Sequence, residues 1–339
     1  MKKILLMAAT AMLSLPIAAQ SIEVKGMQKI SIPDMEAAYV SAVSPDGSFL
    51  LVTSLSLTGL QKYDLTTNEV QTISTAIGAG RDPKISSDGK KIAYRESVYK
   101  DRLRYNSVKS VDLSTGETAT VVSNTRGPLA FEASNAKVAV INKGASTWQQ
   151  FSSFDSDTDI TSTATGATIR AAGATATSAI SDETDATAEV VKPVVGISEW
   201  GLYVSTAEGT TEIFPSGRSK YLWISVSPDA TKILYTVPEG EMIAYTCDID
   251  GSNVTRIGHL HAPVWMGNDW VVGMVDADNG DVITESYIAA APNAQNPTIT
   301  RLTGDDGIYV DPQASEDAST IVCNGAHDGQ IYLISVQTN

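Results

Sequence analysis

A tight-turn motif that recurs along the chain limits the folds open to it. The first copy is Ser44-Pro45-Asp46-Gly47, and related turns are centred on Asp88, Asn135, Asp229, Asp269 and Asp317. Successive turns lie 42, 47, 94, 40 and 48 residues apart, so a unit of nearly constant length repeats. Units of about 40 residues with several short strands are typical of the blades of a β-propeller.

The clearest unit, residues 220–258, shows how one blade is built. Apolar and polar residues alternate over residues 221–226, which predicts a half-buried strand. Further strands are predicted at 232–237, 242–248 and 254–257, because turn-forming residues separate these patterns. Four antiparallel strands in each repeat predict an all-β propeller.

The doubled interval between Asn135 and Asp229 decides the number of blades. Residues 144–192 are rich in Ala, Thr, Ser and Asp and poor in large apolar side chains, a composition typical of loops. We interpret them as a low-complexity insertion, with the strand patterns of residues 194–214 completing the blade that begins at residue 128. This interpretation predicts a six-bladed propeller, and seven blades remain the alternative.

Residues 27–32 alternate like a strand but have no hairpin partner nearby. The last unit, residues 308–337, contains only three strand patterns. An N-terminal strand that pairs with this last blade completes it and covers the free edge of its sheet. We therefore expect the ring to be closed by the N-terminal strand.

The first 20 residues have the pattern of a secretory signal peptide. Lys2 and Lys3 precede an apolar run at residues 4–17, and small residues follow. The run is short for a bilayer crossing, no later stretch is long enough, and no cysteine stands near the cleavage site to carry a lipid. We expect residues 21–339 to form a single propeller domain of a periplasmic or secreted protein without a membrane span.

Charge and cysteine content narrow the choice of partners. The chain has 24 Lys and Arg against 39 Asp and Glu, a net charge of −15. Sequence-independent binding to nucleic acid needs clustered Lys and Arg, so we expect no nucleic-acid partner.

Cys247 and Cys323 fall in blades that are not neighbours, and we expect two buried free thiols rather than a disulfide.

The segments that lead into the innermost strands collect polar side chains. In a propeller these segments lie on one face around the central channel, where residues distant in sequence converge. The candidate ligand-binding residues are Glu36, Arg81, Asp82, Arg126, Arg218, Lys220, His259, His261, Asp305 and Asp306. The alternative interpretation is that they are the polar residues of ordinary surface loops.

Motifs for metal binding and catalysis are incomplete. His259 and His261 project to the same side of an extended segment, but with a carboxylate such as Asp305 they make only a weak zinc pattern. The acidic run at 155–159 begins like a calcium loop, yet its sixth position is Ile160 instead of glycine. No Gly-x-Ser-x-Gly elbow is present. We predict no catalytic residue, no metal and no cofactor.

The repeats resemble those of a known family. The turn sequences, strands such as Lys91-Ile92-Ala93-Tyr94 and hairpins such as Asp112-Leu113-Ser114-Thr115-Gly116 are similar to the propeller repeats of TolB, the periplasmic component of the Tol-Pal system. The resemblance covers residues 37–337 and implies a six-bladed, non-enzymatic, periplasmic propeller that binds proteins. We expect no counterpart of the α/β domain that precedes the TolB propeller, because only about 16 residues separate the expected signal peptide from the first blade.

Two functions follow as hypotheses. The first is a propeller that binds a protein or peptide partner through the face around its channel. The alternative is a carbohydrate-active propeller, a lyase or glycosidase, or a glycan-binding propeller, that uses channel carboxylates. Tryptophans can stack on sugars, but Trp223 and Trp265 lie in innermost strands and are expected in the core.

Overall fold

A computed structural model describes residues 20–126, 129–135, 138–142, 150–151, 159–160, 192–206 and 209–339. All regular elements in these residues are β-strands. The expected signal peptide and most of the expected insertion at 144–192 lie outside the described residues. No helix of the length and apolar character needed to cross a membrane occurs in the described part of the chain.

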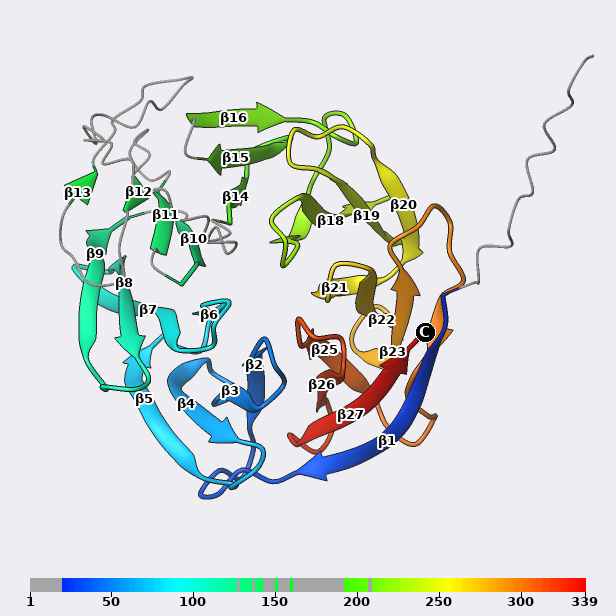
Figure 1. The fold of residues 1–339 in the computed structure, drawn as a ribbon, viewed down its shortest axis with the longest axis horizontal. Helices are drawn as coiled ribbons and strands as arrows, with labels where there is room; N and C mark the ends of the chain where they lie inside the picture. Colours follow the sequence, from blue (N-terminus) through cyan, green and yellow to red (C-terminus); the bar gives the residue numbers. More distant parts are fainter. Residues whose placement is uncertain are drawn as a thin grey trace, which may run out of the picture.

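The strands form sheets arranged around a central opening (Figure 1). The first two sheets consist of β2 (Tyr39–Val43), β3 (Phe49–Thr53), β4 (Thr58–Asp64) and β5 (Val70–Ile77), and of β6 (Lys84–Ile85), β7 (Lys91–Lys100), β8 (Leu103–Asp112) and β9 (Thr118–Thr125). Next come the pairs β10 (Leu129–Ala133) with β11 (Val138–Asn142) and β12 (Gln150–Phe151) with β13 (Asp159–Ile160), and the three-stranded sheet of β14 (Val194–Ile197), β15 (Leu202–Thr206) and β16 (Gly209–Ile213).

Three four-stranded sheets complete the ring. They consist of β17 (Leu222–Val226), β18 (Lys232–Pro238), β19 (Met242–Asp248) and β20 (Thr255–His259); of β21 (His261–Met266), β22 (Trp270–Asp278), β23 (Ile283–Pro292) and β24 (Thr300–Arg301); and of β25 (Tyr309–Ala314), β26 (Thr320–Gly325), β27 (Ile331–Thr338) and β1 (Ile22–Ile30). Neighbours within each sheet are antiparallel, and the prediction of an all-β propeller is confirmed.

The described residues contain six blades of three or four strands, in agreement with the predicted number. The prediction of how the third blade is built is wrong, however. Strands β14 to β16 form a sheet of their own and are not hydrogen-bonded to β10 and β11. The innermost strand β14 contacts both β10 and β17, so the pair β10–β11 occupies a further, two-stranded position in the ring.

The N-terminal strand pairs with the last strand of the chain. β1 runs antiparallel to β27 from Ile22 opposite Thr338 to Ile30 opposite Ile331, with a register shift near Gly26. The strand therefore spans Ile22–Ile30 rather than the expected residues 27–32, and it supplies the outermost strand of the blade that β25 begins.

The recurring turn is held by a buried serine and an aspartate. The Ser44 hydroxyl donates to Asp46 at 2.8 Å and accepts from the Phe49 N–H at 3.0 Å. The same pattern joins Ser86 to Asp88 and Ser227 to Asp229, each at 2.6 Å. These serines are almost fully buried, so the hydroxyl satisfies groups that water cannot reach. The turn motif that recurs in the sequence therefore forms the same hydrogen-bonded turn in each of these blades.

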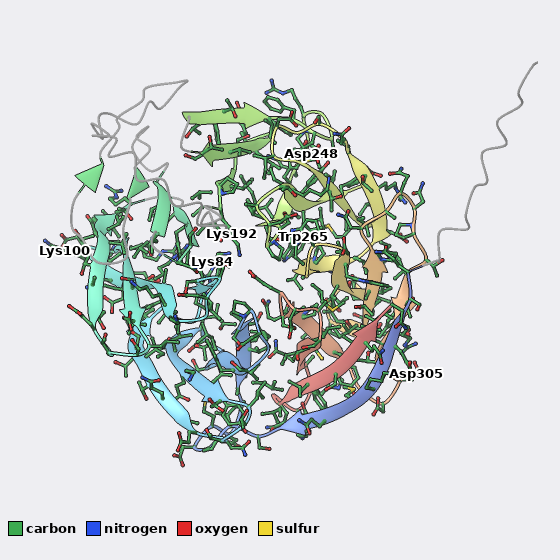
Figure 2. The ribbon with its side chains drawn as sticks, viewed as in Figure 1. Lys84, Lys100, Lys192, Asp248, Trp265 and Asp305 are labelled. Atoms are coloured by element: carbon green, nitrogen blue, oxygen red, sulfur yellow. The ribbon has the colours of Figure 1, made fainter. Side chains whose placement is uncertain are left out.

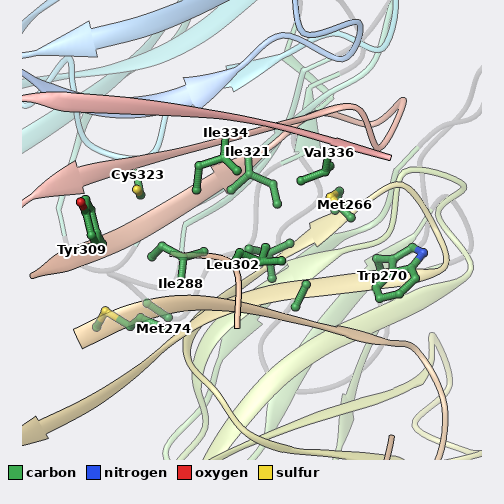
Figure 3. Packing of buried hydrophobic residues seen from close by; sticks show 13 residues of the cluster. Met266, Trp270, Met274, Ile288, Leu302, Tyr309, Ile321, Cys323, Ile334 and Val336 are labelled. Carbon is green, nitrogen blue, oxygen red and sulfur yellow. The ribbon is translucent and has the colours of Figure 1, made fainter. Parts of the chain in front are cut away.

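The hydrophobic core lies between neighbouring blades. One cluster, shown in Figure 3, joins the β21–β24 sheet to the β25–β27 sheet through residues such as Met266, Ile288 and Ile334. Another joins the last blade to the first through Ile32, Val40 and Ile331. Because each sheet buries both faces against its neighbours, the blades hold the innermost strands at constant positions around the channel.

Candidate functional site

The central channel contains a cavity with a volume of about 570 Å³. It is lined by β2, the segment 80–85, β17, β21 and β25, together with Glu132 and Lys192. Figure 2 shows Lys84 and Lys192 beside the central opening. The two ends of this channel differ in their chemistry.

One end is crossed by an ion pair. Lys192 Nζ lies 2.6 Å from Glu316 Oε1, and the Lys192 side chain is 9% exposed. Glu316 belongs to the turn after β25, while Lys192 precedes β14. Sheets β14–β16 and β25–β27 are not neighbours in the ring, so the contact spans the channel. The cavity is therefore obstructed at the end where the turns lie.

A second lysine joins neighbouring segments of the wall. Lys84 Nζ lies 2.9 Å from Asp82 Oδ1 and 3.4 Å from Glu132 Oε1. Burial alone would lower the pKa of Lys84, but the two carboxylates outweigh it and raise that pKa above its ordinary value. The lysine remains charged and fixes β6 to β10.

The other end carries a cluster of aromatic and titratable side chains, which we call the channel mouth: Tyr39, Trp223, His261, Asp276 and Asp311. His261 Nδ1 lies 2.9 and 3.0 Å from the two carboxylate oxygens of Asp276, so this nitrogen carries the hydrogen and donates. The Trp223 ring meets the His261 ring edge-on, with centroids 4.3 Å apart. The Tyr39 hydroxyl lies within hydrogen-bonding range of Asp311.

Burial at the mouth favours the protonated forms of Asp311 and Tyr39. Burial raises the pKa of Asp311, and the nearby charge of Asp276 raises it further, whereas Tyr39 and His261 lower it. Burial and the proximity of Asp311 also raise the pKa of Tyr39. Such perturbed groups in a cavity mark a place where a ligand can be bound.

The backbone of the innermost strands brings these side chains to the mouth. The register shifts between Leu222 and Ser225 in β17, between His261 and Val264 in β21, and between Val310 and Gln313 in β25. At each bulge one residue takes a left-handed conformation: Trp223 (φ 43°), Ala262 (φ 46°) and Asp311 (φ 49°). A bulge inserts an extra residue and breaks the alternation of side chains. Because it recurs in three blades, this conformation belongs to the repeat.

The structure distributes the ten predicted site residues over several places. Arg81 and Asp82 line the channel wall, and His261 belongs to the mouth. His261 contacts Trp223 but does not itself line the cavity. The remaining seven neither line the cavity nor belong to the mouth: Glu36, Arg126, Arg218, Lys220, His259, Asp305 and Asp306.

Several of these seven make local contacts away from the cavity. His259 Nδ1 lies 3.5 Å from Glu241, Asp305 pairs with Arg301, and the Lys220 ammonium lies 4.0 Å from the centre of the Trp200 ring. The His259–His261 pair therefore does not converge on one ligand, because each imidazole faces a different carboxylate.

Sequence reasoning missed four residues of the mouth. Tyr39, Asp276 and Asp311 were not singled out, and Trp223 was expected in the core. The core expectation is right for Trp265, which is 7% exposed, and wrong for Trp223, which is 40% exposed. Asp276 lies in β22 directly after the apolar residues 270–275, and a charged residue that ends such an apolar run is the signal that could have found it.

A metal site is not formed by the residues described above. Within the described ranges, no three His, Cys, Asp or Glu side chains stand close enough together to hold an ion.

Solved structures similar to this chain are propellers. The β-propeller domain of Cps50 (Swd1) from Myceliophteria thermophila gives a TM-score of 0.59 at 10% identity, covering 94% of this chain and 100% of that one. The β-propeller domain of the trilobed protease from Pyrococcus furiosus gives a TM-score of 0.56 at 14% identity. The match covers 90% of this chain and 95% of that one. TolB from Acinetobacter baumannii gives 0.51 at 12% identity and covers 82% of this chain.

These likenesses establish the fold alone. The chain spans 57% of the length of the TolB structure. No protein-family model and no curated protein matches the sequence. The TolB-like propeller predicted from the repeats is confirmed as a fold, and function has to be argued from the site.

Proposed function

We propose that this protein is a periplasmic or secreted propeller, without an enzymatic activity of its own, that binds a protein or peptide partner at its channel mouth. The observation that carries the proposal is the convergence of Tyr39, Trp223, His261, Asp276 and Asp311 at one end of a cavity of about 570 Å³. The Lys192–Glu316 ion pair crosses the other end, so a ligand enters from the mouth and stops inside the channel.

The chemistry of the mouth suits a cationic group of the partner. Trp223 and Tyr39 offer aromatic faces, and a cation over such a face is attracted by the ring. Asp276 and Asp311 each use part of their hydrogen-bonding capacity on His261 and Tyr39, and keep other acceptor positions. Burial favours the protonated form of Asp311, and a bound cation favours its ionised form. A lysine or arginine side chain, or the amino terminus of a peptide, matches these acceptors. The net charge of −15 attracts such a partner.

Binding of short peptides tests the proposal. We expect fluorescein-labelled peptides with a lysine or arginine to bind, and their alanine counterparts to bind at least about tenfold more weakly, since a desolvated ion pair contributes more than about 1 kcal/mol. Trp223→Ala and Asp311→Asn should each reduce affinity. Trp200→Ala is the matched control, because Trp200 is similarly exposed, at 36% against 40%, and does not line the cavity. Equal loss in Trp200→Ala, or none in the mouth variants, contradicts the proposal.

A glycan ligand is the second candidate. The specific observation in its favour is an exposed tryptophan, Trp223, next to a histidine and two carboxylates, a combination that can stack on a sugar ring and transfer protons. Incubation with neutral and acidic oligosaccharides, followed by measurement of newly formed reducing ends, distinguishes a carbohydrate-active function from peptide binding. Cleavage that is lost in His261→Ala and Asp276→Asn would replace peptide binding by a carbohydrate-active function.

A further inference from the structure

The hairpin of β7 and β8 extends beyond its blade. The two strands pair continuously from Lys91 opposite Asp112 to Lys100 opposite Leu103. Their neighbours stop earlier: β6 pairs with β7 only at residues 92–93, and β9 pairs with β8 no further than Asn106. The end of the hairpin, residues 97–105, is therefore two-stranded, and we call it the arm. Figure 2 shows Lys100 of the arm at the outer rim of the ring.

The arm exposes large apolar side chains. Val98 is 57% exposed, Tyr99 is 62% exposed and Leu103 is 39% exposed. Blade one has a shorter hairpin at the corresponding place, because β3 has five residues where β7 has ten. An extension that adds exposed apolar surface does not stabilise the isolated propeller, and such surface is typical of a contact with a partner.

The arm is also basic, in a chain of strongly acidic composition. Lys100, Arg102 and Arg104 are exposed, and none of them forms an ion pair with another described residue. Asp101 is the single acidic residue between positions 97 and 105. Three unpaired cations on one hairpin create a local positive field that attracts carboxylates.

The positive charge continues from the arm towards the channel. Burial lowers the pKa of Arg95, the nearby Asp82 carboxylate raises it, and the guanidinium groups of Arg81 and Arg104 lower it further. Arg95 Nη2 donates to the Leu129 carbonyl at 2.9 Å, but its Nε atom is buried and has no hydrogen-bond partner among the described residues. Arg81 lies in the channel wall, so arginines connect the arm with the edge of the channel.

The arrangement of the arm selects an extended protein segment over other anions. Pairing places Tyr99 opposite Arg104 and Lys100 opposite Leu103, so each face of the hairpin combines an apolar and a basic residue. Along β8, however, apolar and basic residues alternate as Leu103, Arg104 and Tyr105. A strand of alternating apolar and acidic residues that pairs with β8 places its carboxylates on the face of Arg104 and its apolar side chains on the face of Leu103. At the arm, the edge of β8 has no neighbouring strand among the described residues, and an extended segment can pair with it.

We propose that the arm binds an extended segment of a partner protein in which acidic and apolar residues alternate. Carboxylates of the segment pair with Arg104 and, at the tip of the arm, with Arg102, while its apolar side chains lie against Leu103 on the opposite face. A bilayer fits less well, because the turn at the tip is charged and the chain as a whole carries −15. An acidic polysaccharide has no apolar side chains to cover the arm. This surface is separate from the channel mouth and does not depend on its proposed function.

Fluorescence anisotropy with a labelled peptide that alternates glutamate with valine or leucine tests the proposal. We expect this peptide to bind the mature protein, and a counterpart with lysine in place of glutamate not to bind. Arg102→Glu combined with Arg104→Glu should weaken binding by at least about tenfold, because each reversal removes one attraction and adds one repulsion. Leu103→Ser should weaken it as well.

Two controls separate the arm from other surfaces. Lys25→Glu reverses an exposed charge on β1 and should leave affinity unchanged, and Trp223→Ala should do the same if the arm acts apart from the mouth. Circular dichroism and melting temperature establish that the arm variants fold. The proposal is overturned if the glutamate peptide does not bind, if the lysine peptide binds equally, or if the arm variants bind normally. It is also overturned if phosphatidylglycerol vesicles or polygalacturonate bind in an arm-dependent way while the peptide does not.

Discussion

Replacing Gly80 with alanine should destabilise the propeller through one contact between the first blade and the segment that leads to the second blade. Gly80 lies in the segment between β5 and β6, directly before Arg81 and Asp82 of the channel wall. A Cβ atom at this position would stand 2.2 Å from Thr53 Oγ1, and 2.4 and 2.5 Å from Thr53 Cβ and Cγ2. Ordinary contacts between such atoms are about 3.5–4.0 Å, so the two segments have to separate by more than about 1 Å.

The loss of stability follows from the packing and the hydrogen bond of Thr53 that this separation disturbs. Over-packing of a buried position costs about 1–3 kcal/mol. Thr53 is 1% exposed, and its hydroxyl donates to the Gly59 carbonyl at 2.6 Å. Losing that hydrogen bond adds about 1 kcal/mol. We expect Gly80→Ala to lower the free energy of unfolding by about 2–4 kcal/mol, which for a chain of this length lowers the melting temperature by about 3–6 °C.

Urea unfolding, followed by tryptophan fluorescence, measures this change. Gly196→Ala is the matched control, because Gly196 also lies in extended backbone and a Cβ there meets no atom within 4 Å. In a Thr53→Gly background the obstructing side chain is gone, and the cost of Gly80→Ala should fall below about 1 kcal/mol. If Gly80→Ala costs as much in that background as in the wild-type protein, the contact with Thr53 is not the cause and the reasoning fails.

Three further expectations concern the ring, the mouth and the thiols. Deletion of residues 21–33 removes β1 and the buried side chains of Ile30 and Ile32, each of which contributes about 1.5–3 kcal/mol to stability. The deletion should therefore lower the melting temperature and cause aggregation at the exposed edge of β27. An unchanged melting temperature contradicts the pairing of β1 with β27. Burial raises the pKa of Asp311, so the folded protein holds this proton more tightly than the unfolded chain does, and the wild-type protein should lose stability relative to Asp311→Asn as the pH rises through the folded pKa. Melting curves between pH 4 and pH 7 measure the difference in stability between the two proteins. A difference that does not change with pH contradicts a raised pKa of Asp311. Burial raises the pKa of Cys247 to about 12 and also raises that of Cys323, so iodoacetamide at pH 8 should label these thiols only after unfolding; rapid labelling of the native protein shows that they are accessible.

The sequence determined the features that depend on neighbouring residues. The Ser44–Asp46 turn and its copies follow from side chains two residues apart that bond to each other and to the adjacent backbone, so the period of the blades can be read directly. Alternation of apolar and polar residues predicted the strands, and the unpartnered N-terminal pattern predicted a strand that pairs with the last blade. These features depend on residues that are close together in the sequence, so they can be predicted from the sequence alone.

Only the tertiary structure decided which residues meet across the channel. Alternation places successive side chains on opposite faces of a strand, but the bulges in β17, β21 and β25 add one residue each and reverse that assignment, so Trp223 is exposed at the mouth instead of buried. Asp276 reaches His261 because β22 is long enough to extend to the channel edge, and Lys192 reaches Glu316 because their sheets face each other across the ring. Such contacts depend on the distances between blades, which the packing of whole sheets sets and which no short stretch of sequence encodes.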